Sequence, residues 1–149
     1  MRVYRLARAP YATLDGEGAR RRGGRWTPPG KPAVYTSQHR SLALLEVVVH
    51  LDLTPELLPD DYVMLGIEIP DSVAVMLAPH HAPFPIAFDF PQVGLAWIEG
   101  GEAAVLSVPS VIVPEERNFI INPAHAAAAA IVISETVPFE LDRRLRSQA

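Results

Sequence analysis

Residues 33–51 have the sequence AVYTSQHRSLALLEVVVHL, and this stretch decides the fold class. Its beginning, AVYTS at 33–37, combines small, β-branched and aromatic side chains and predicts a short strand. The following segment, RSLALLEVVVHL at 40–51, is apolar on nearly every face. Its length favours a buried helix, although the three consecutive valines are more typical of a strand. A strand that leads into a buried helix indicates a domain in which both kinds of element share one core.

Further strands and helices are predicted on both sides of this stretch. Runs of β-branched and aromatic residues predict strands at 2–7, 62–69, 103–113 (with a kink at Pro109), 118–123 and 131–139. The alanine-rich run 124–130 predicts a helix, and 94–99 a short helix or turn. Glycines and prolines predict irregular structure at 9–32 and 70–94. The 149 residues are therefore expected to form a single α+β domain, 1–149, of short strands with a few helices.

The composition is that of a globular protein and excludes several classes of site. Hydrophobic residues make up 49% of the chain and charged residues 20%, which argues against intrinsic disorder. The absence of cysteine excludes disulfide scaffolds, thiolate zinc sites and cysteine nucleophiles. No apolar run reaches the roughly 18 residues of a membrane span, and the basic N-terminus lacks the apolar core of a signal peptide. We therefore expect a cytoplasmic protein with no membrane association.

Charge is distributed unevenly along the chain, whose net charge is −4. Residues 1–40 contain nine Lys or Arg and two acidic residues, whereas residues 41–116 contain twelve acidic residues and no Lys or Arg. This asymmetry fits either an anion-binding site built early in the chain or two segments that pair across the fold. A pI of about 5.7 and the lack of a basic stripe or a helix-turn-helix pattern argue against nucleic-acid binding.

Glu46 is the most unusual residue of the predicted helix. No other charged residue lies within five positions of it. A carboxylate among apolar side chains is costly to bury unless it is paired or hydrogen-bonded. His50 follows one helical turn later and is placed to be such a partner. Glu46 is therefore either a functional carboxylate or a residue on the one exposed strip of an otherwise apolar helix.

Four arginines lie in the glycine-rich segment that precedes the strand at 33–37. Arg25 stands beside Trp26 and the rigid pair Pro28-Pro29, so it is expected to be ordered. The triplet Arg20–Arg22 is expected to lie in a solvated, flexible loop. Arginine with glycine-rich backbone suits phosphate binding, because guanidinium and amide groups both donate to anionic oxygens. The segment matches neither a P-loop nor a dinucleotide-binding fingerprint.

Other polar residues give weaker indications. Arg5, alone in an apolar strand, is expected at an exposed edge, and Tyr35 fits either the core or a stacking platform. Ser110 lies in an apolar stretch, where its hydroxyl needs a partner such as the backbone, and no G-x-S-x-G pattern surrounds it. The histidines, including the solvated pair His80-His81, show no metal-ligand spacing, so no metal site is expected.

Four motifs, in the same order along the chain, resemble the RES domain family. They are GGRWTPPGKPAVYTS, SLALLEVVVHL, LSVPSVIVPEERNFIINPAH and PFELDRRL, and with them the resemblance covers nearly the whole chain. It implies a fold similar to that of ADP-ribosyltransferases and NAD as a substrate that is consumed. It also implies a toxin of a toxin–antitoxin pair, with an Xre-like helix-turn-helix antitoxin as partner. Whether the protein forms a homodimer stays open.

The resemblance also assigns site residues. The arginine, glutamate and serine for which the family is named correspond to Arg25, Glu46 and Ser110, which are expected to be catalytic. The family's strand arginine and its tyrosine correspond to Arg5 and Tyr35. Arg25 and Ser110 join these two in the expected NAD-binding set. Three departures from the family pattern leave all these positions intact, and they are Thr27 for asparagine, Ala126 for proline and Arg143 for proline.

These assignments imply separate roles on NAD. Glu46 would stabilise the sugar cation that forms when nicotinamide leaves. Arg5 and Arg25 would hold the pyrophosphate. Ser110 would hydrogen-bond a phosphate or ribose oxygen, and Tyr35 would pack on the nicotinamide. The acceptor of the ADP-ribose stays open between water, phosphate and a protein side chain. A non-catalytic module that binds a nucleotide or an antitoxin tail through the same basic cleft is the alternative.

Overall fold

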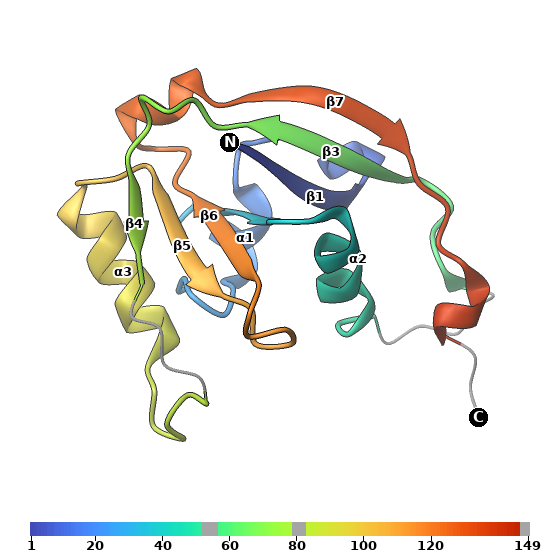
Figure 1. The fold of residues 1–149 in the computed structure, drawn as a ribbon, viewed down its shortest axis with the longest axis horizontal. Helices are drawn as coiled ribbons and strands as arrows, with labels where there is room; N and C mark the ends of the chain where they lie inside the picture. The colour runs from blue at the N-terminus through green and yellow to red at the C-terminus, as the bar shows by residue number, and fades with distance from the viewer. Residues whose placement is uncertain (52–56, 79–82, 147–149) are drawn as a thin grey trace.

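Seven strands form one sheet in the computed structural model, which describes residues 1–51, 57–78 and 83–146 (Figure 1). In sheet order, the strands are β4 (Val75–Leu77), β5 (Val105–Pro109), β6 (Arg117–Ile121), β2 (Val34–Ser37), β1 (Arg2–Arg8), β3 (Tyr62–Glu68) and β7 (Val132–Pro138). Neighbours are antiparallel except β4 and β5, which are parallel. The helices within these ranges are α1 (Glu17–Arg22), α2 (Arg40–Val48) and α3 (Phe90–Gly100), with 3-10 turns at Ala9–Tyr11, Ala126–Ala130 and Arg143–Arg146. The predicted α+β class is confirmed.

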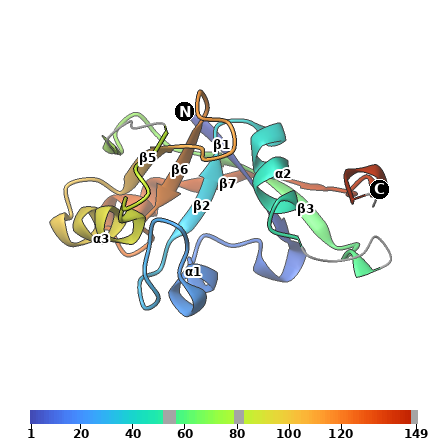
Figure 2. The same cartoon turned by 90° about the horizontal axis from the view of Figure 1, so that it is seen from below.

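The sheet is nearly divided between β1 and β2. Every residue from Arg2 to Arg8 pairs with β3, and every residue of β2 pairs with β6. Within the described part of the chain, β1 and β2 share a single register pair, Tyr4 with Ser37. The two halves of the sheet therefore meet at one point and diverge away from it. Helix α2 follows the Ser37 end of β2, at this junction, whereas α1 lies beside the opposite end of that strand (Figure 2).

Helix α2 follows β2 after a short turn and packs against β1. Ala43 is buried in an apolar cluster that also contains Leu6 of β1. At the first turn of the helix, the Arg40 guanidinium lies over the ring of Tyr4, 4.8 Å from its centroid. Arg40 also forms an ion pair with Glu135 of β7. Apolar packing and these charge contacts together fix the helix beside the junction.

Helix α3 covers the other half of the sheet. Trp97 is 2% exposed and packs in a cluster with Leu106 of β5 and Ile120 of β6. Its indole N–H donates to the carbonyl of Ala103 at 2.8 Å, so the buried polar atom is satisfied. Trp26, from the segment before β2, belongs to the same cluster. No helix in the described ranges is both long and apolar enough to span a membrane.

Segment 9–32 is more regular than its glycine content predicts, since it contains α1. Gly16 and Gly23, with φ of 69° and 74°, flank the helix at its two ends. Asp15 Oδ1 accepts a hydrogen bond from the backbone N–H of Glu17 at 2.9 Å and so satisfies a free donor of the first turn. The prediction of an entirely irregular segment is wrong, because these glycines delimit a helix instead of preventing one.

Segment 70–94 also contains regular structure that the sequence did not indicate. It includes the edge strand β4 and the first turn of α3. That helix begins early because Asp89 Oδ1 accepts from the backbone N–H of Gln92 at 3.0 Å and Pro91 fits the first turn. The short helix predicted at 94–99 is therefore an eleven-residue helix.

The remaining elements agree with the sequence to within a few residues at most positions. The strands predicted at 2–7, 33–37, 62–69, 118–123 and 131–139 and a helix within 40–51 are confirmed. The helix ends at Val48, and the prediction that it is buried is wrong, because only Leu42 and Ala43 are buried where it packs on the sheet. Two other elements differ in extent or type. The strand at 103–113 ends at Pro109 and gives way to a turn, and the alanine run forms a 3-10 helix over Ala126–Ala130.

Candidate functional site

A cavity with a volume of about 400 Å³ lies where β1 and β2 diverge, bounded by residues of α1 and α2. Four of the five predicted site residues line it, each from a different element: Arg5 (β1), Arg25 (the α1–β2 segment), Tyr35 (β2) and Glu46 (α2). These side chains converge because the sheet opens at this point. The fifth residue, Ser110, lies behind Glu46, as described below.

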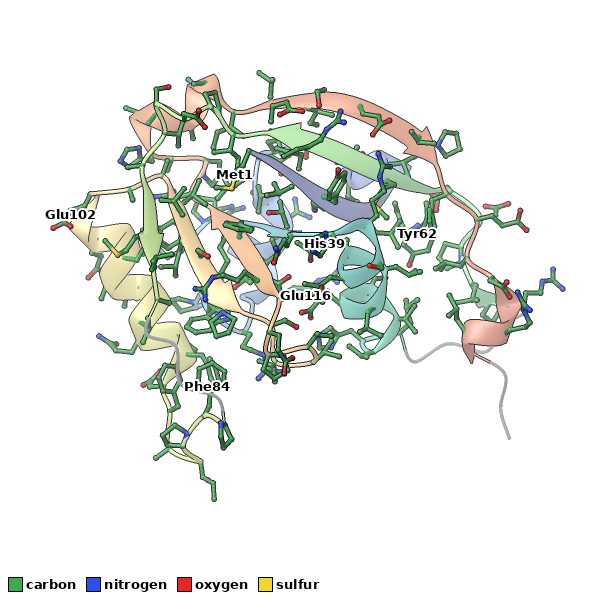
Figure 3. All side chains as sticks on the ribbon, viewed as in Figure 1. Met1, His39, Tyr62, Phe84, Glu102 and Glu116 are labelled. Carbon is green, nitrogen blue, oxygen red and sulfur yellow. The ribbon has the colours of Figure 1, made fainter. Side chains whose placement is uncertain are left out.

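Glu46 projects from α2 and is half-buried. Its Oε1 accepts two hydrogen bonds, from the hydroxyl of Ser110 at 2.9 Å and from the side-chain amide of Asn118 at 2.5 Å. Both partners belong to the far half of the sheet, at the ends of β5 and β6 that face α2. The turn between these strands, where Glu116 is labelled in Figure 3, approaches the C-terminal half of α2. Glu46 is thus anchored across the fold and does not lie on an exposed helix strip.

Ser110 is completely buried and does not line the cavity. Its hydroxyl donates to Glu46 and accepts from the backbone N–H groups of Ile112 and Val113, each at 3.1 Å. Its own N–H donates to the carbonyl of Glu116 at 2.9 Å. The expected direct bond from Ser110 to a substrate oxygen does not fit this position, because the hydroxyl proton is already used on Glu46 and the oxygen is enclosed.

Arg25 lies on a tight turn that ends in a buried Trp26. The turn is closed by a hydrogen bond from the N–H of Gly24 to the carbonyl of Thr27 at 2.8 Å. The hydroxyl of Tyr35 accepts from the N–H of Trp26 at 3.1 Å and lies 2.9 Å from the hydroxyl of Thr27. A side chain at Gly24 would overlap the Tyr35 ring. The turn that carries Arg25 is therefore fixed directly to β2.

Aromatic rings hold the same turn from its other side. The Arg25 guanidinium lies over the ring of Phe90, 5.4 Å from its centroid. Phe90 belongs to a cluster of four aromatic rings, whose centroids lie 4.6 to 6.1 Å apart: Trp26, Phe84, Phe88 and Phe90. Phe84, labelled in Figure 3, lies in the segment that leads into α3. A Cβ at Gly94 would overlap the carbonyl of Trp26, so α3 lies directly against the turn. Arg25 is in this way placed at the cavity by contacts on both sides.

Tyr35 lines the cavity, while its hydroxyl is committed to the Arg25 turn. Burial raises the pKa of this phenol, against a smaller opposing effect of its hydrogen bond with Thr27. The phenol is therefore neutral at physiological pH, and its ring faces the cavity as an apolar surface. Tyr35 thus packs against the core and also lines the cavity, and its use as a stacking platform stays a prediction.

Arg5 is half-buried in the cavity wall and not at an exposed sheet edge. Its Nη1 donates to the backbone carbonyls of Thr13 at 2.6 Å and Tyr11 at 3.2 Å. Burial lowers the pKa of its guanidinium, and the nearby charge of Asp15 opposes that shift. Among the described residues, neither Arg5 nor Arg25 forms a salt bridge. Two guanidinium groups thus face the cavity with no carboxylate bound to them.

The arginine triplet Arg20–Arg22 lies outside the cavity lining. It forms the last turn of α1 and is not the flexible loop that the sequence predicts. Arg20 and Arg21 both bind Glu17, at 2.6 and 2.8 Å, and these bonds lower the pKa of Glu17 to about 2. Two of the triplet's three guanidinium groups are therefore bound within the helix to Glu17, whose single negative charge offsets one of their positive charges.

The histidines have varied positions. His50 lies just beyond α2 and lines the cavity, but no hydrogen bond joins it to Glu46, although both residues are described. His125 Nδ1 accepts from the N–H of Ala127, which gives it a structural role. The pair His80-His81 lies outside the described residues. Within the described ranges, no group of three His, Asp or Glu side chains could hold a metal ion.

Sequence reasoning missed two polar residues of the site, Asn118 and Ser37. The hydroxyl of Ser37 donates to Asn118 Oδ1 at 2.7 Å, and Asn118 donates to Glu46. The available signal was alternation within the strand, since Asn118 occupies the same face of β6 as the buried Ile120. A polar side chain on the inward face of a strand needs an internal partner.

Comparisons with known proteins agree with this architecture. The RES domain family matches residues 2–142. A toxin Res of Photorhabdus laumondii is 40% identical over 83% of this chain and 82% of its own length. A Sphingobium protein named Prs ADP-ribosylating toxin is 38% identical over 91% of this chain and 88% of its own length.

A third relative and a solved structure extend the comparison. A toxin Res of Yersinia enterocolitica is 33% identical over 98% of this chain and all of its own length. The crystal structure of the M. tuberculosis MbcT–MbcA toxin–antitoxin complex matches with a TM-score of 0.71 at 22% identity, covering 93% of this chain and 83% of that one, which shows a shared fold. The chain belongs to the RES domain family and is a toxin of the RES type.

Proposed function

We propose that this toxin cleaves the bond between nicotinamide and ribose in NAD. The observation that carries the proposal is the position of Glu46, held by one carboxylate oxygen in the same cavity as Arg5 and Arg25. The substrate is anionic at its pyrophosphate and becomes cationic at the ribose as the bond breaks. A carboxylate and two guanidinium groups that form no salt bridge with the described residues complement these charges.

The residues of the cavity have distinct roles in this reaction. Nicotinamide departs as a neutral molecule with the bonding electron pair, and positive charge develops on the ribose. Glu46 stabilises that charge, while Arg5 and Arg25 bind the pyrophosphate and hold the substrate in place. The ring of Tyr35 offers an apolar surface to the nicotinamide. Ser110 acts behind Glu46 and fixes its carboxylate, a role different from the expected substrate contact.

The fate of the ADP-ribose group distinguishes two reactions that share this cleavage step. Attack by water or phosphate gives a free product, whereas attack by a protein side chain gives a modified target. The similarity to a protein named Prs ADP-ribosylating toxin supports the second outcome. The similarity in fold to a toxin bound to its antitoxin supports an antitoxin as the partner of this chain, and the resemblance to the RES family implies that it is an Xre-like helix-turn-helix protein.

The test of the proposal follows both halves of NAD. Purified protein is incubated with NAD labelled in its adenylate moiety, and free nicotinamide is measured together with the label. We expect nicotinamide to accumulate in a protein-dependent manner. Label in small products indicates water or phosphate as acceptor, and label on a protein added from a bacterial extract indicates protein modification. If the protein binds NAD but releases no nicotinamide under either condition, it is a binding module and the proposal is wrong.

A further inference from the structure

The Glu46 carboxylate is held asymmetrically. Both of the hydrogen bonds that it accepts, from Ser110 and from Asn118, end on Oε1. Its Oε2 accepts none from the described residues. A carboxylate bound through one oxygen has a fixed orientation, and the lone pairs of its second oxygen remain available to a substrate. The two oxygens of Glu46 are therefore not equivalent in this fold.

The side-chain amide of Asn118 has only one consistent orientation. Its Oδ1 accepts from the hydroxyl of Ser37 at 2.7 Å, so its NH₂ group faces Glu46. A reversed amide would place Oδ1 against Glu46 Oε1, and two acceptors would then face each other. Ser37 is 4% exposed, so water does not compete freely for this arrangement. The carboxylate of Glu46, which can only accept, thus determines which end of the amide meets it, and the hydroxyl of Ser37 holds the other end in place by donating to Oδ1.

The register of the sheet places these two residues together. Ser37 and Asn118 are direct partners in the β2–β6 ladder, and cross-strand partners project on the same face. Beyond the end of β2, Gln38 donates its N–H to the carbonyl of Arg117, and its Oε1 accepts from the N–H of Arg117, each at 3.0 Å. This doubled contact holds the register at the site. The chain of hydrogen bonds from Ser37 through Asn118 to Glu46 therefore rests on rigid strands.

We infer that Asn118, held in place by Ser37, is a positioning residue that fixes Glu46 so that Oε2 is the oxygen presented to the ribose. The inference rests on the proposed cleavage of NAD. Asn118 acts through Glu46: it provides a fixed N–H donor that holds the carboxylate before the substrate binds, so no reorganisation is needed as charge develops. Ser37 acts one hydrogen bond further away.

Steady-state kinetics of nicotinamide release separate positioning from substrate binding. We expect Asn118→Ala to lower kcat by about 10- to 100-fold with KM changed less than about threefold. Asn118→Asp keeps the shape of the side chain but replaces the donor by a second acceptor, and we expect it to lower kcat at least as much as Asn118→Ala does. Ser37→Ala is expected to lower kcat about three- to tenfold. The matched control is Ser107→Ala, which removes a buried hydroxyl from β5 on the opposite face of the sheet, where it binds Arg117, and is expected to leave kcat unchanged.

A double-mutant cycle tests whether Asn118 acts through Glu46. In the Glu46→Gln background, adding Asn118→Ala should change the residual rate less than about twofold, because the group that Asn118 positions is no longer a carboxylate. A loss as large as in the wild-type background would show that Asn118 acts independently and would overturn the inference. Wild-type kcat for both Asn118 variants, whether KM is unchanged or raised, would overturn the inference as well.

A crystal structure of Asn118→Ala gives a readout that does not depend on activity. We expect the Glu46 carboxylate to leave its wild-type position or to occupy several conformers, with Ser110 still in place. A Glu46 side chain ordered as in the wild type would overturn the inference even if NAD were cleaved. Conversely, a displaced Glu46 in a protein whose wild type releases no nicotinamide would support the positioning role while refuting the proposed function.

Discussion

The hydroxyl of Ser110 donates to Glu46 Oε1 at 2.9 Å, although the two residues are 64 positions apart in the chain. The contact joins α2, which packs on β1, to the end of β5, and so links two halves of the sheet that share, among the described residues, the single register pair of Tyr4 with Ser37. The same hydroxyl accepts two backbone N–H groups from the turn that follows it. One side chain therefore shapes the turn and orients the carboxylate.

Replacing Ser110 should affect both stability and turnover. Ser110→Ala leaves two buried N–H donors without their acceptor, which we expect to lower the free energy of unfolding by about 1–3 kcal/mol. It also releases one bond on Glu46, so kcat should fall at least tenfold. Urea denaturation and nicotinamide release measure the two effects. An unchanged kcat in a folded Ser110→Ala variant would contradict the role of Ser110 behind Glu46.

Arg25 should contribute far more to NAD affinity than the arginines of α1. Its turn is fixed by Tyr35 and Phe90, so little ordering entropy is lost when it binds phosphate. In a catalytically inactive Glu46→Gln background, we expect Arg25→Ala to raise the NAD dissociation constant by about tenfold or more in calorimetric titration. Arg22→Ala is the matched control, because Arg22 is exposed and outside the cavity lining. Its effect should stay below about twofold at physiological salt. An equal increase of the NAD dissociation constant in both variants would indicate diffuse electrostatic attraction without a specific phosphate contact.

Gly94 should tolerate no side chain. A methyl group there would overlap the carbonyl of Trp26 and push α3 away from the turn that carries Arg25. We expect Gly94→Ala to destabilise the protein by at least about 2 kcal/mol and to weaken NAD binding. Gly100→Ala, at the other end of the same helix, adds a methyl group into open space and should be neutral or slightly stabilising. Equal melting temperatures for the two variants would show that the contact between α3 and the turn is not close.

The antitoxin should compete with NAD for the cavity. Arg5 and Arg25 form no salt bridge with the described residues, so they attract a carboxylate or an acidic segment as well as a pyrophosphate. We expect a bound antitoxin, through an inserted C-terminal tail, to prevent a non-hydrolysable NAD analogue from binding to the Glu46→Gln variant. Simultaneous binding with no loss of affinity would exclude occlusion and require an allosteric mechanism.

Local sequence patterns predicted much of the fold and of the cavity lining. The runs at 33–37 and 40–51 predicted a strand and a helix because the residue types of the first and the length of the second are local properties of the sequence. Helix α1 was not predicted because it has no apolar periodicity. Glycines delimit it at both ends, and ion pairs of Glu17 with Arg20 and Arg21 support it. Glu46 and Arg25 were singled out from the residues themselves, because a carboxylate is costly to bury among apolar side chains and a rigid proline turn orders an arginine. Arg5, expected at an exposed edge, was assigned to the site only by the family resemblance.

The parts that the sequence did not reveal depend on which strands become neighbours. Ser110 was expected to contact the substrate, and only the arrangement of β5 and α2 shows it behind Glu46. The contact between Ser37 and Asn118 depends on β2 pairing with β6, two strands separated along the chain by most of the domain. No local pattern specifies such a pairing, because strand order results from the packing of the whole sheet.

The central claim is that the carboxylate of Glu46 promotes loss of nicotinamide from NAD. The most direct measurement is the rate of nicotinamide release by purified wild-type protein, by Glu46→Gln and by Glu115→Gln, a matched change at an exposed carboxylate in the turn after β5. We expect Glu46→Gln to lower the rate at least about a hundredfold while its circular dichroism and melting temperature show a folded protein, and Glu115→Gln to match the wild type. Wild-type release of nicotinamide by a folded Glu46→Gln variant would contradict the account.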